Sequence, residues 1–274
     1  PRNGCFLPFR SRAKPALCQA SVSRSHRSKS QSNPGDEAES ELLHLASRRQ
    51  LAECVRKFSL LDADSRARVL NGQNKAKNKR FLFRNTFFDC AKRQKASKAA
   101  FDLFMASDLG HDDLGHDGIE IHHRYGHPPA DKGSDLARRN LHVTNRSGLA
   151  LGVLQVCARA GDSATAMRVL DHVRNAWGMT PDVFMYTLAI STLRSNPSEA
   201  SSIFERATKE DYIQPDAFMY CALLKSYHGA IVGAARSKAG GADGVKEKLL
   251  REAIADTVED MQARDVEGDA VFYN

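Results

Sequence analysis

Two stretches of the chain, 34 residues apart, decide its fold: TPDVFMYT at residues 180–187 and QPDAFMYC at residues 214–221. A related stretch, EGDAVFYN at residues 267–274, follows 53 residues after the second. Ala166, Ala200 and Ala253 are separated by the same 34 and 53 residues. Because two independent sets of positions repeat in register, the sequence indicates an internal repeat with a period near 34 residues.

Each repeat predicts two short helices. In the middle repeat, apolar residues at helical spacing form one stripe and then another: Tyr186, Ala189, Ile190 and Leu193, followed by Ala200, Ile203, Phe204 and Ala207. Between the stripes, Asn196 is placed as an N-cap and Pro197 as the first residue of the second helix.

The preceding repeat has the same plan, with a turn at residues 160–163. Its first helix carries Leu149, Val153, Val156 and Cys157, and its second carries Ala166, Val169, Leu170 and Val173. A helix hairpin of this size cannot bury its apolar faces alone, so the repeats are expected to stack into an all-α solenoid.

The opening Val-x-x-Tyr-Thr, the Ala-x-x-Ile-Phe of the second helix and the closing Pro-Asp resemble the pentatricopeptide repeat family. Residues 183–216 match well and residues 147–182 less well. Residues 217–269 form an expanded unit with an insertion at 229–244, expected as a flexible loop, and residues 270–274 are a truncated start. The related tetratricopeptide repeat shares the length but not the Tyr-Thr opening.

The resemblance implies an organellar protein that reads single-stranded RNA, with one unstacked base per repeat. It implies that the residue after the Tyr and the last residue of a repeat contact the base edge, here Thr187 with Asp216. It also implies that the second residue of each repeat lies against the base faces, here Phe184 and Phe218. A Thr–Asp pair resembles the family's guanine-favouring pair.

The other units match this scheme less closely. The expanded unit pairs Cys221 with Asp269, and the truncated unit supplies Val271 and Asn274 without a partner. The first unit has Leu151 or Gly152 at the base-reading position, so we interpret it as a packing unit. Near the ends of the first helices, Arg159 and Arg194 are candidates for phosphate contacts.

An alternative explanation of the aromatic residues is packing between repeats. For Tyr186 and Tyr220 we prefer this structural explanation, because aromatic residues at helical spacing usually belong to a core. For Phe184 and Phe218, base stacking and packing stay equally open.

The net charge of +7 is unevenly distributed. Residues 1–35 hold seven Lys or Arg and no acidic residue, and residues 48–98 hold fifteen basic and four acidic ones. Residues 99–274 hold eighteen basic and twenty-five acidic residues, so attraction to polyanions is expected mainly in the first hundred residues.

The ends of the chain suggest a processed fragment. Residues 1–35 are basic, rich in Ser and acid-free, which predicts an organellar transit peptide, with the plastid slightly preferred over the mitochondrion; a disordered nucleic-acid-binding tail is the alternative. The chain begins at Pro1 and stops at the opening of a repeat. Six Cys without a C-x-x-C pair fit a reducing compartment.

Residues 36–107 predict a helical region. Residues 41–61 have helical spacing, and Lys98–Phe104 resembles a second helix 66 residues before its counterpart, so a degenerate repeat is expected over residues 72–107. The basic run 75–80 is either a phosphate contact or a linker. Residues 108–146 are expected to be a loop or linker, in which the His-rich segment 111–127 is more consistent with a polar surface loop than with a metal site.

No arrangement of nucleophile and base, phosphate-binding Gly loop or paired carboxylates indicates an enzyme, and no cofactor or metal is predicted. The expected partners are single-stranded organellar RNA and other RNA-processing proteins, without a membrane. The predicted role is RNA processing, stabilisation or translation. A tetratricopeptide-like scaffold that binds peptides is the alternative, because residues 99–274 are net acidic.

Overall fold

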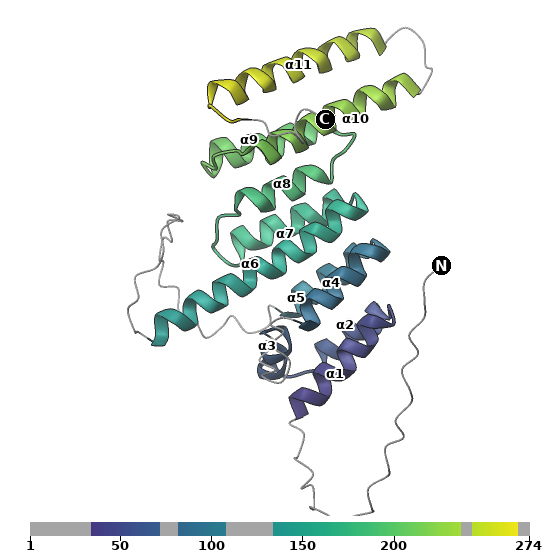
Figure 1. Ribbon diagram of the computed structural model, residues 1–274, viewed down its shortest axis with the longest axis vertical. Helices are drawn as coiled ribbons and strands as arrows, with labels where there is room; N and C mark the ends of the chain where they lie inside the picture. Colours follow the sequence, from purple (N-terminus) through teal and green to yellow (C-terminus); the bar gives the residue numbers. More distant parts are fainter. Residues whose placement is uncertain (1–33, 72–81, 108–133, 237–242, 268–274) are drawn as a thin grey trace, which may run out of the picture. The chain divides into compact units, whose positions relative to one another are not determined.

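A computed structural model describes residues 34–71, 82–107, 134–236 and 243–267. Every regular element within these ranges is a helix, which confirms the predicted all-α class (Figure 1). The helices are α1 (Pro34–Ser47), α2 (Leu51–Ser59), α3 (Ala63–Asn71), α4 (Leu82–Gln94), α5 (Ser97–Ser107), α6 (Ser134–Ala160), α7 (Ser163–Asn175), α8 (Val183–Ser191), α9 (Pro197–Glu205), the π-helical turn η1 (Arg206–Glu210), α10 (Ala217–Arg236) and α11 (Asp243–Ala263).

The helices pair as hairpins, and neighbouring hairpins contact each other. Within the hairpins, α1 packs on α2, α4 on α5, α6 on α7, α8 on α9 and α10 on α11. Between hairpins, the first helices make successive contacts, α1 with α4, α4 with α6, α6 with α8 and α8 with α10. The second helices α2, α5 and α7 are in contact in the same order. Each first helix therefore covers the apolar face of the next one.

Three hairpins share one turn geometry. Their first helices end at residues with positive φ, namely Arg49, Lys95 and Gly161. The N–H that follows each of these residues donates to a carbonyl five residues earlier, which satisfies a free carbonyl of the last turn. Only Gly161 adopts this left-handed backbone without steric cost.

The hairpin α4–α5 corresponds closely to α6–α7. A shift of 66 residues carries Gln94, the end of α4, to Ala160, the end of α6, and carries Ser97, the start of α5, to Ser163, the start of α7. It carries Ser107, the end of α5, to Val173, two residues before α7 ends at Asn175. Two helices thus lie in the region for which a degenerate repeat is expected.

The same two hairpins are joined by polar and aromatic contacts. The Ser97 hydroxyl donates to Asp162 over 2.6 Å, and Asp162 also caps α7 by accepting from the Thr165 N–H. Trp177 is buried with its ring centroid 5.1 Å from that of Phe104. These contacts connect the front half of the chain directly to the unit before the middle repeat.

The apolar stripes predicted for the middle repeat are buried. All eight of their residues lie in the core, and Asn196 caps α9 by accepting from the Glu199 N–H, with Pro197 at the first helical position. The first unit is likewise buried along its predicted stripes, and its turn separates α6 from α7. Helical periodicity and capping therefore predicted these elements correctly.

Residues 41–61, which have helical spacing, are divided between α1 and α2, and Arg49 with φ 64° lies between the two helices. Two expectations about connecting segments were wrong. Residues 134–146, expected to belong to a loop, begin α6, since the chain has no Gly or Pro between Ser134 and Ser147 to stop it.

The second wrong expectation is the loop at the insertion. Residues 229–236 extend α10 instead, because Ala230 and Ile231 pack against the core and the Ala-rich sequence favours helix. Of the other residues of the insertion, 237–242 lie outside the described ranges, and Asp243 and Gly244 begin α11.

The two repeated Tyr residues are buried and each donates to an Asp. The Tyr186 hydroxyl donates to Asp211, which Arg174 also contacts, and the Tyr220 hydroxyl donates to Asp260 over 2.7 Å. Burial, together with the hydrogen bond to Asp211, raises the pKa of Tyr186 well above its ordinary value. Both Tyr are thus structural, as the sequence suggested.

Replacing Tyr186 with Phe is expected to lower the free energy of unfolding by about 1–3 kcal/mol, because Asp211 is buried and loses a donor. Urea unfolding followed by far-ultraviolet circular dichroism measures the change. Tyr227→Phe is the matched control, since its hydroxyl bonds only the neutral Ser201 hydroxyl over 2.7 Å. Equal losses in the two variants would contradict a special role for the carboxylate.

Candidate functional site

Two aromatic side chains project from equivalent positions of neighbouring first helices. Phe184 is the second residue of α8 and Phe218 the second residue of α10, and the two side chains are 52% and 56% exposed. The Tyr two residues further along each helix is fully buried. Both Phe rings therefore lie at the surface and are not buried between the repeats.

The Asp residues before these helices act as caps. Asp182 accepts from the Met185 N–H over 2.9 Å, and Asp216 accepts from the Met219 N–H over 2.8 Å. Each bond uses the Oδ1 atom. The Oδ2 atom of Asp216 retains its capacity to accept a further hydrogen bond.

Thr187 is half-buried at the fifth position of α8, and its hydroxyl donates to the Val183 carbonyl over 2.7 Å. With its single proton in that bond, the hydroxyl oxygen acts toward a ligand as an acceptor. Cys221 is half-buried at the equivalent position of α10, where the thiol is a weak hydrogen-bonding group.

The first unit does not continue this pattern. Leu151 is half-buried and Gly152 is buried, and neither offers a polar side chain. A β-carbon at Gly152 would lie 2.5 Å from the Phe88 ring, so this position serves the close contact between α6 and α4. The interpretation of this unit as a packing unit agrees with that contact.

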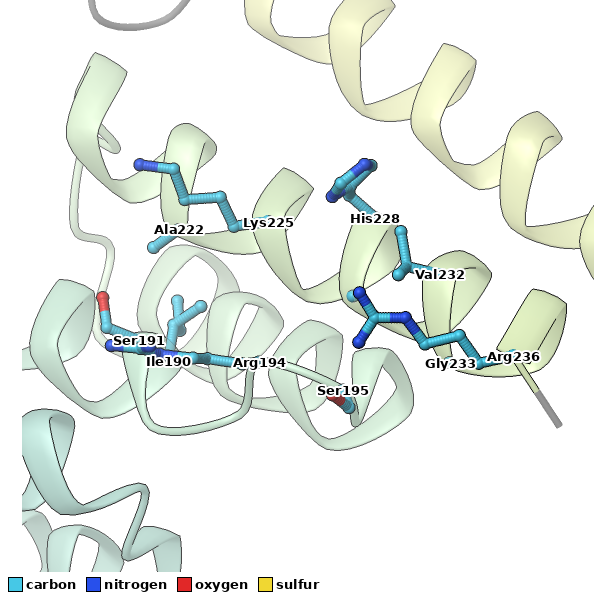
Figure 2. Close-up of a pocket in the computed structure, with 11 residues that line it drawn as sticks. Ile190, Ser191, Arg194, Ser195, Ala222, Lys225, His228, Val232, Gly233 and Arg236 are labelled. Atoms are coloured by element: carbon cyan, nitrogen blue, oxygen red, sulfur yellow. The ribbon is translucent and has the colours of Figure 1, made fainter.

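A pocket with a cavity volume of about 680 Å³ lies between the end of α8, the turn after it and α10 (Figure 2). It is lined by basic, hydroxyl and small apolar side chains and by two glycines: Ile190, Ser191, Arg194, Ser195, Ala222, Lys225, His228, Gly229, Val232, Gly233 and Arg236. No carboxylate is among the lining residues.

The pocket and the candidate base-reading residues follow the same helix faces. On α10, Phe218, Cys221 and Lys225 are spaced by three and four residues, and His228 and Val232 continue the series. On α8, Phe184, Thr187 and Ser191 have the same spacing. The repeat shift of 34 residues relates Ser191 to Lys225 and Arg194 to His228.

In the hairpins α8–α9 and α10–α11, the acidic side chains lie on the second helices and not on the first. Neither α8 nor α10 contains an Asp or Glu, whereas α11 contains six acidic and three basic residues. The acidic balance of residues 99–274 therefore does not extend to the face formed by α8 and α10. The face formed by α8 and α10 is therefore a second region that can attract polyanions, besides the one expected in the first hundred residues.

Of the remaining predicted site residues, some lie in the described ranges and others lie outside them. Arg194 lines the pocket, whereas Arg159 is exposed in the last turn of α6 and does not line it. Asp269, Val271 and Asn274 lie outside the described residues, as do the basic run 75–80, the His-rich segment 111–127 and nearly all of the predicted leader.

Sequence reasoning missed Lys225, His228 and Arg236. Lys225 and His228 could have been found by aligning residues 183–216 with residues 217–269, because both residues continue the face of α10 that carries Phe218. Arg236 could not, since it lies in the insertion, which was expected to be a loop.

In the described ranges, no three His, Cys, Asp or Glu side chains are grouped so that they could hold a metal ion. No helix in these ranges has both the length and the apolar character needed to cross a bilayer. Comparisons of the chain with known protein families, with curated proteins and with solved structures find no match.

Proposed function

We propose that this chain is a helical-repeat protein of the pentatricopeptide type that binds single-stranded RNA in an organelle, without catalysis of its own. The observation that carries the proposal is the exposure of Phe184 and Phe218 at positions 34 residues apart. Large aromatic side chains that repeat at the surface of successive helices suit stacking on successive bases.

The helix contacts support a solenoid. Each first helix contacts the first helix of the next hairpin, from α1 through to α10. This nearest-neighbour packing is the architecture expected for stacked helix hairpins. A solenoid in turn brings the equivalent residues of successive repeats to one side, which is what a ligand-reading surface needs.

The electrostatics favour RNA over an acidic or neutral peptide. Clustered carboxylates would repel the phosphates of an RNA strand, and neither α8 nor α10 contains an Asp or Glu. The net acidic balance of residues 99–274 comes largely from other segments, so it does not weigh against RNA binding.

The pair Thr187 and Asp216 favours guanine on chemical grounds. The Thr187 hydroxyl proton is used within α8, and Asp216 retains an accepting oxygen. Two acceptors complement a base edge with two adjacent donors, and guanine offers its N1–H and its exocyclic amine. This preference coincides with the one that the family resemblance implies.

The leader composition supports import into an organelle, with the plastid preferred, and a role in RNA processing, stability or translation. A fusion of residues 1–40 to a fluorescent reporter, with the start of the protein restored, tests the location. Diffuse cytosolic fluorescence would contradict both organelles.

Filter binding of single-stranded RNA at about 50 and 200 mM salt tests the function. The affinity is expected to fall as salt rises, because phosphate contacts release counterions. Absence of affinity, or affinity that does not respond to salt, would reject the RNA proposal and leave the peptide-binding scaffold.

Thr187→Asn tests the base-reading role in the full chain. The change keeps a short polar side chain but alters its donors and acceptors, and it is expected to move the preference from guanine toward uracil. The affinities of RNAs that differ at one base measure it. A folded variant with unchanged preference would remove Thr187 from base recognition.

Cys221 gives an independent test through its reactivity. It is half-buried on the candidate face, whereas burial raises the pKa of Cys54 and Cys157 to about 12. At about pH 8, alkylation is therefore expected at Cys221 and at the half-buried Cys90, and not at the two buried thiols. Among the four thiols that the structure describes, bound RNA should slow alkylation of Cys221 alone, as measured by mass spectrometry, and equal slowing of Cys90 would contradict the site.

A further inference from the structure

We infer that the pocket between the α8–α9 turn and α10 binds a phosphate group, and, resting on the proposed function, that this group belongs to the backbone of the RNA strand. Arg194, Lys225 and Arg236 place cationic side chains along the lining of this cavity, and His228 adds an imidazole. Guanidinium and ammonium groups are the side chains that most often bind phosphate oxygens in proteins.

These cations are not neutralised within the protein. In the described part of the chain, no ion pair engages Arg194, Lys225, His228 or Arg236. Arginines on other surfaces of the repeats do have acidic partners: Arg174 with Asp211, Arg206 with Asp171, Arg251 with Glu247 and Arg264 with Asp260. The pocket therefore concentrates positive charge that other faces of the protein cancel.

The lining of the pocket suits an anionic ligand. Ile190, Ala222 and Val232 contribute apolar lining, which strengthens the attraction between an anion and the surrounding cations by reducing hydration. The Ser195 hydroxyl adds a hydrogen-bonding group, whereas the Ser191 hydroxyl already donates its proton to the Thr187 carbonyl over 2.8 Å. At Gly233 a β-carbon would meet no atom within 4 Å, so this residue leaves space along the wall.

The position of the pocket fits a strand whose bases lie at Thr187 and Cys221. Lys225 lies one helical turn beyond Cys221, about 6 Å along the axis of α10. Arg236 reaches the pocket only because α10 continues through the insertion. The extension of α10 thus has a function: it adds a cation to a site that a shorter helix would leave open.

The experiment compares Lys225→Gln/Arg236→Gln with Lys209→Gln/Lys248→Gln in RNA binding by the full chain across a salt series. The control removes two exposed charges from η1 and α11, outside the pocket. The pocket variant is expected to bind about tenfold more weakly at low salt. Its plot of log affinity against log salt should be shallower by about 0.7 for each phosphate that the variant no longer neutralises. Base preference should not change.

A second variant, Gly233→Leu, fills the wall of the pocket without altering charge and should also weaken binding. Circular dichroism verifies that each variant is folded. If the pocket variants and the control behave alike while the wild-type chain binds RNA, the inference is overturned and the proposed function stands.

If the wild-type chain binds no RNA, the proposed function fails and calorimetric titration with pyrophosphate examines the pocket alone. Pyrophosphate binding that disappears in Lys225→Gln/Arg236→Gln would keep the phosphate site and remove RNA as its source. No binding of pyrophosphate would overturn the site as well.

Discussion

Removing both exposed rings, as Phe184→Ala with Phe218→Ala, is expected to weaken binding of single-stranded RNA by about 1–3 kcal/mol for each base that loses its stacking partner. Both side chains are more than half exposed, so the free energy of unfolding should change by less than about 0.5 kcal/mol. Filter binding and urea unfolding of the same preparations measure the two quantities together.

Tyr212→Gly is the matched control for loss of an aromatic surface. Tyr212 is 86% exposed between η1 and α10, and its φ of 53° suits glycine. This variant should bind RNA as the wild type does. Reduced stability of the Phe184/Phe218 variant with unchanged RNA affinity would show that the rings serve packing and would remove the central support for RNA binding.

Replacing Gly229 with Ala is expected to lower the free energy of unfolding by about 1–3 kcal/mol, or to displace α10 from the turn after α8. A β-carbon at this position would lie 1.8 Å from the Arg194 carbonyl oxygen, and backbone atoms cannot rotate away as a side chain can. Since the same contact borders the pocket, RNA affinity should fall with stability.

Gly233→Ala provides the control within the same helix. No atom lies within 4 Å of a β-carbon there, so the substitution should be neutral or should stabilise the helix by up to about 1 kcal/mol. Urea unfolding of the two variants separates the steric effect from helix propensity. Equal stabilities of Gly229→Ala and Gly233→Ala would show that α10 does not need the close approach.

Much of the candidate site follows from the sequence, and some of it does not. Phe184 and Phe218 were identified because they are the second residues of repeats that resemble the pentatricopeptide family, and Arg194 because it lies near the end of a first helix. Arg236 was missed, because a stretch with Gly229 and Gly233 was expected to form a loop. Glycine weakens a helix by only about 1 kcal/mol, and the packing of Ala230 and Ile231 is enough to offset that cost.

The sequence by itself determined the all-α class, the starts of α7, α8 and α9 and the burial of Tyr186 and Tyr220. These features depend on caps and apolar spacing within one or two helical turns, and such interactions are local.

Only the tertiary structure decided which residues meet across repeats. Tyr186 contacts Asp211 after the π-helical turn η1, whereas Tyr220 contacts Asp260, which the 53-residue shift aligns with Ala207 and not with Asp211. The placement of Arg194 beside α10, where Lys225 and Arg236 line the same pocket, is equally non-local. Such pairings depend on where helices far apart in sequence come into contact, and repeat spacing alone does not specify that geometry.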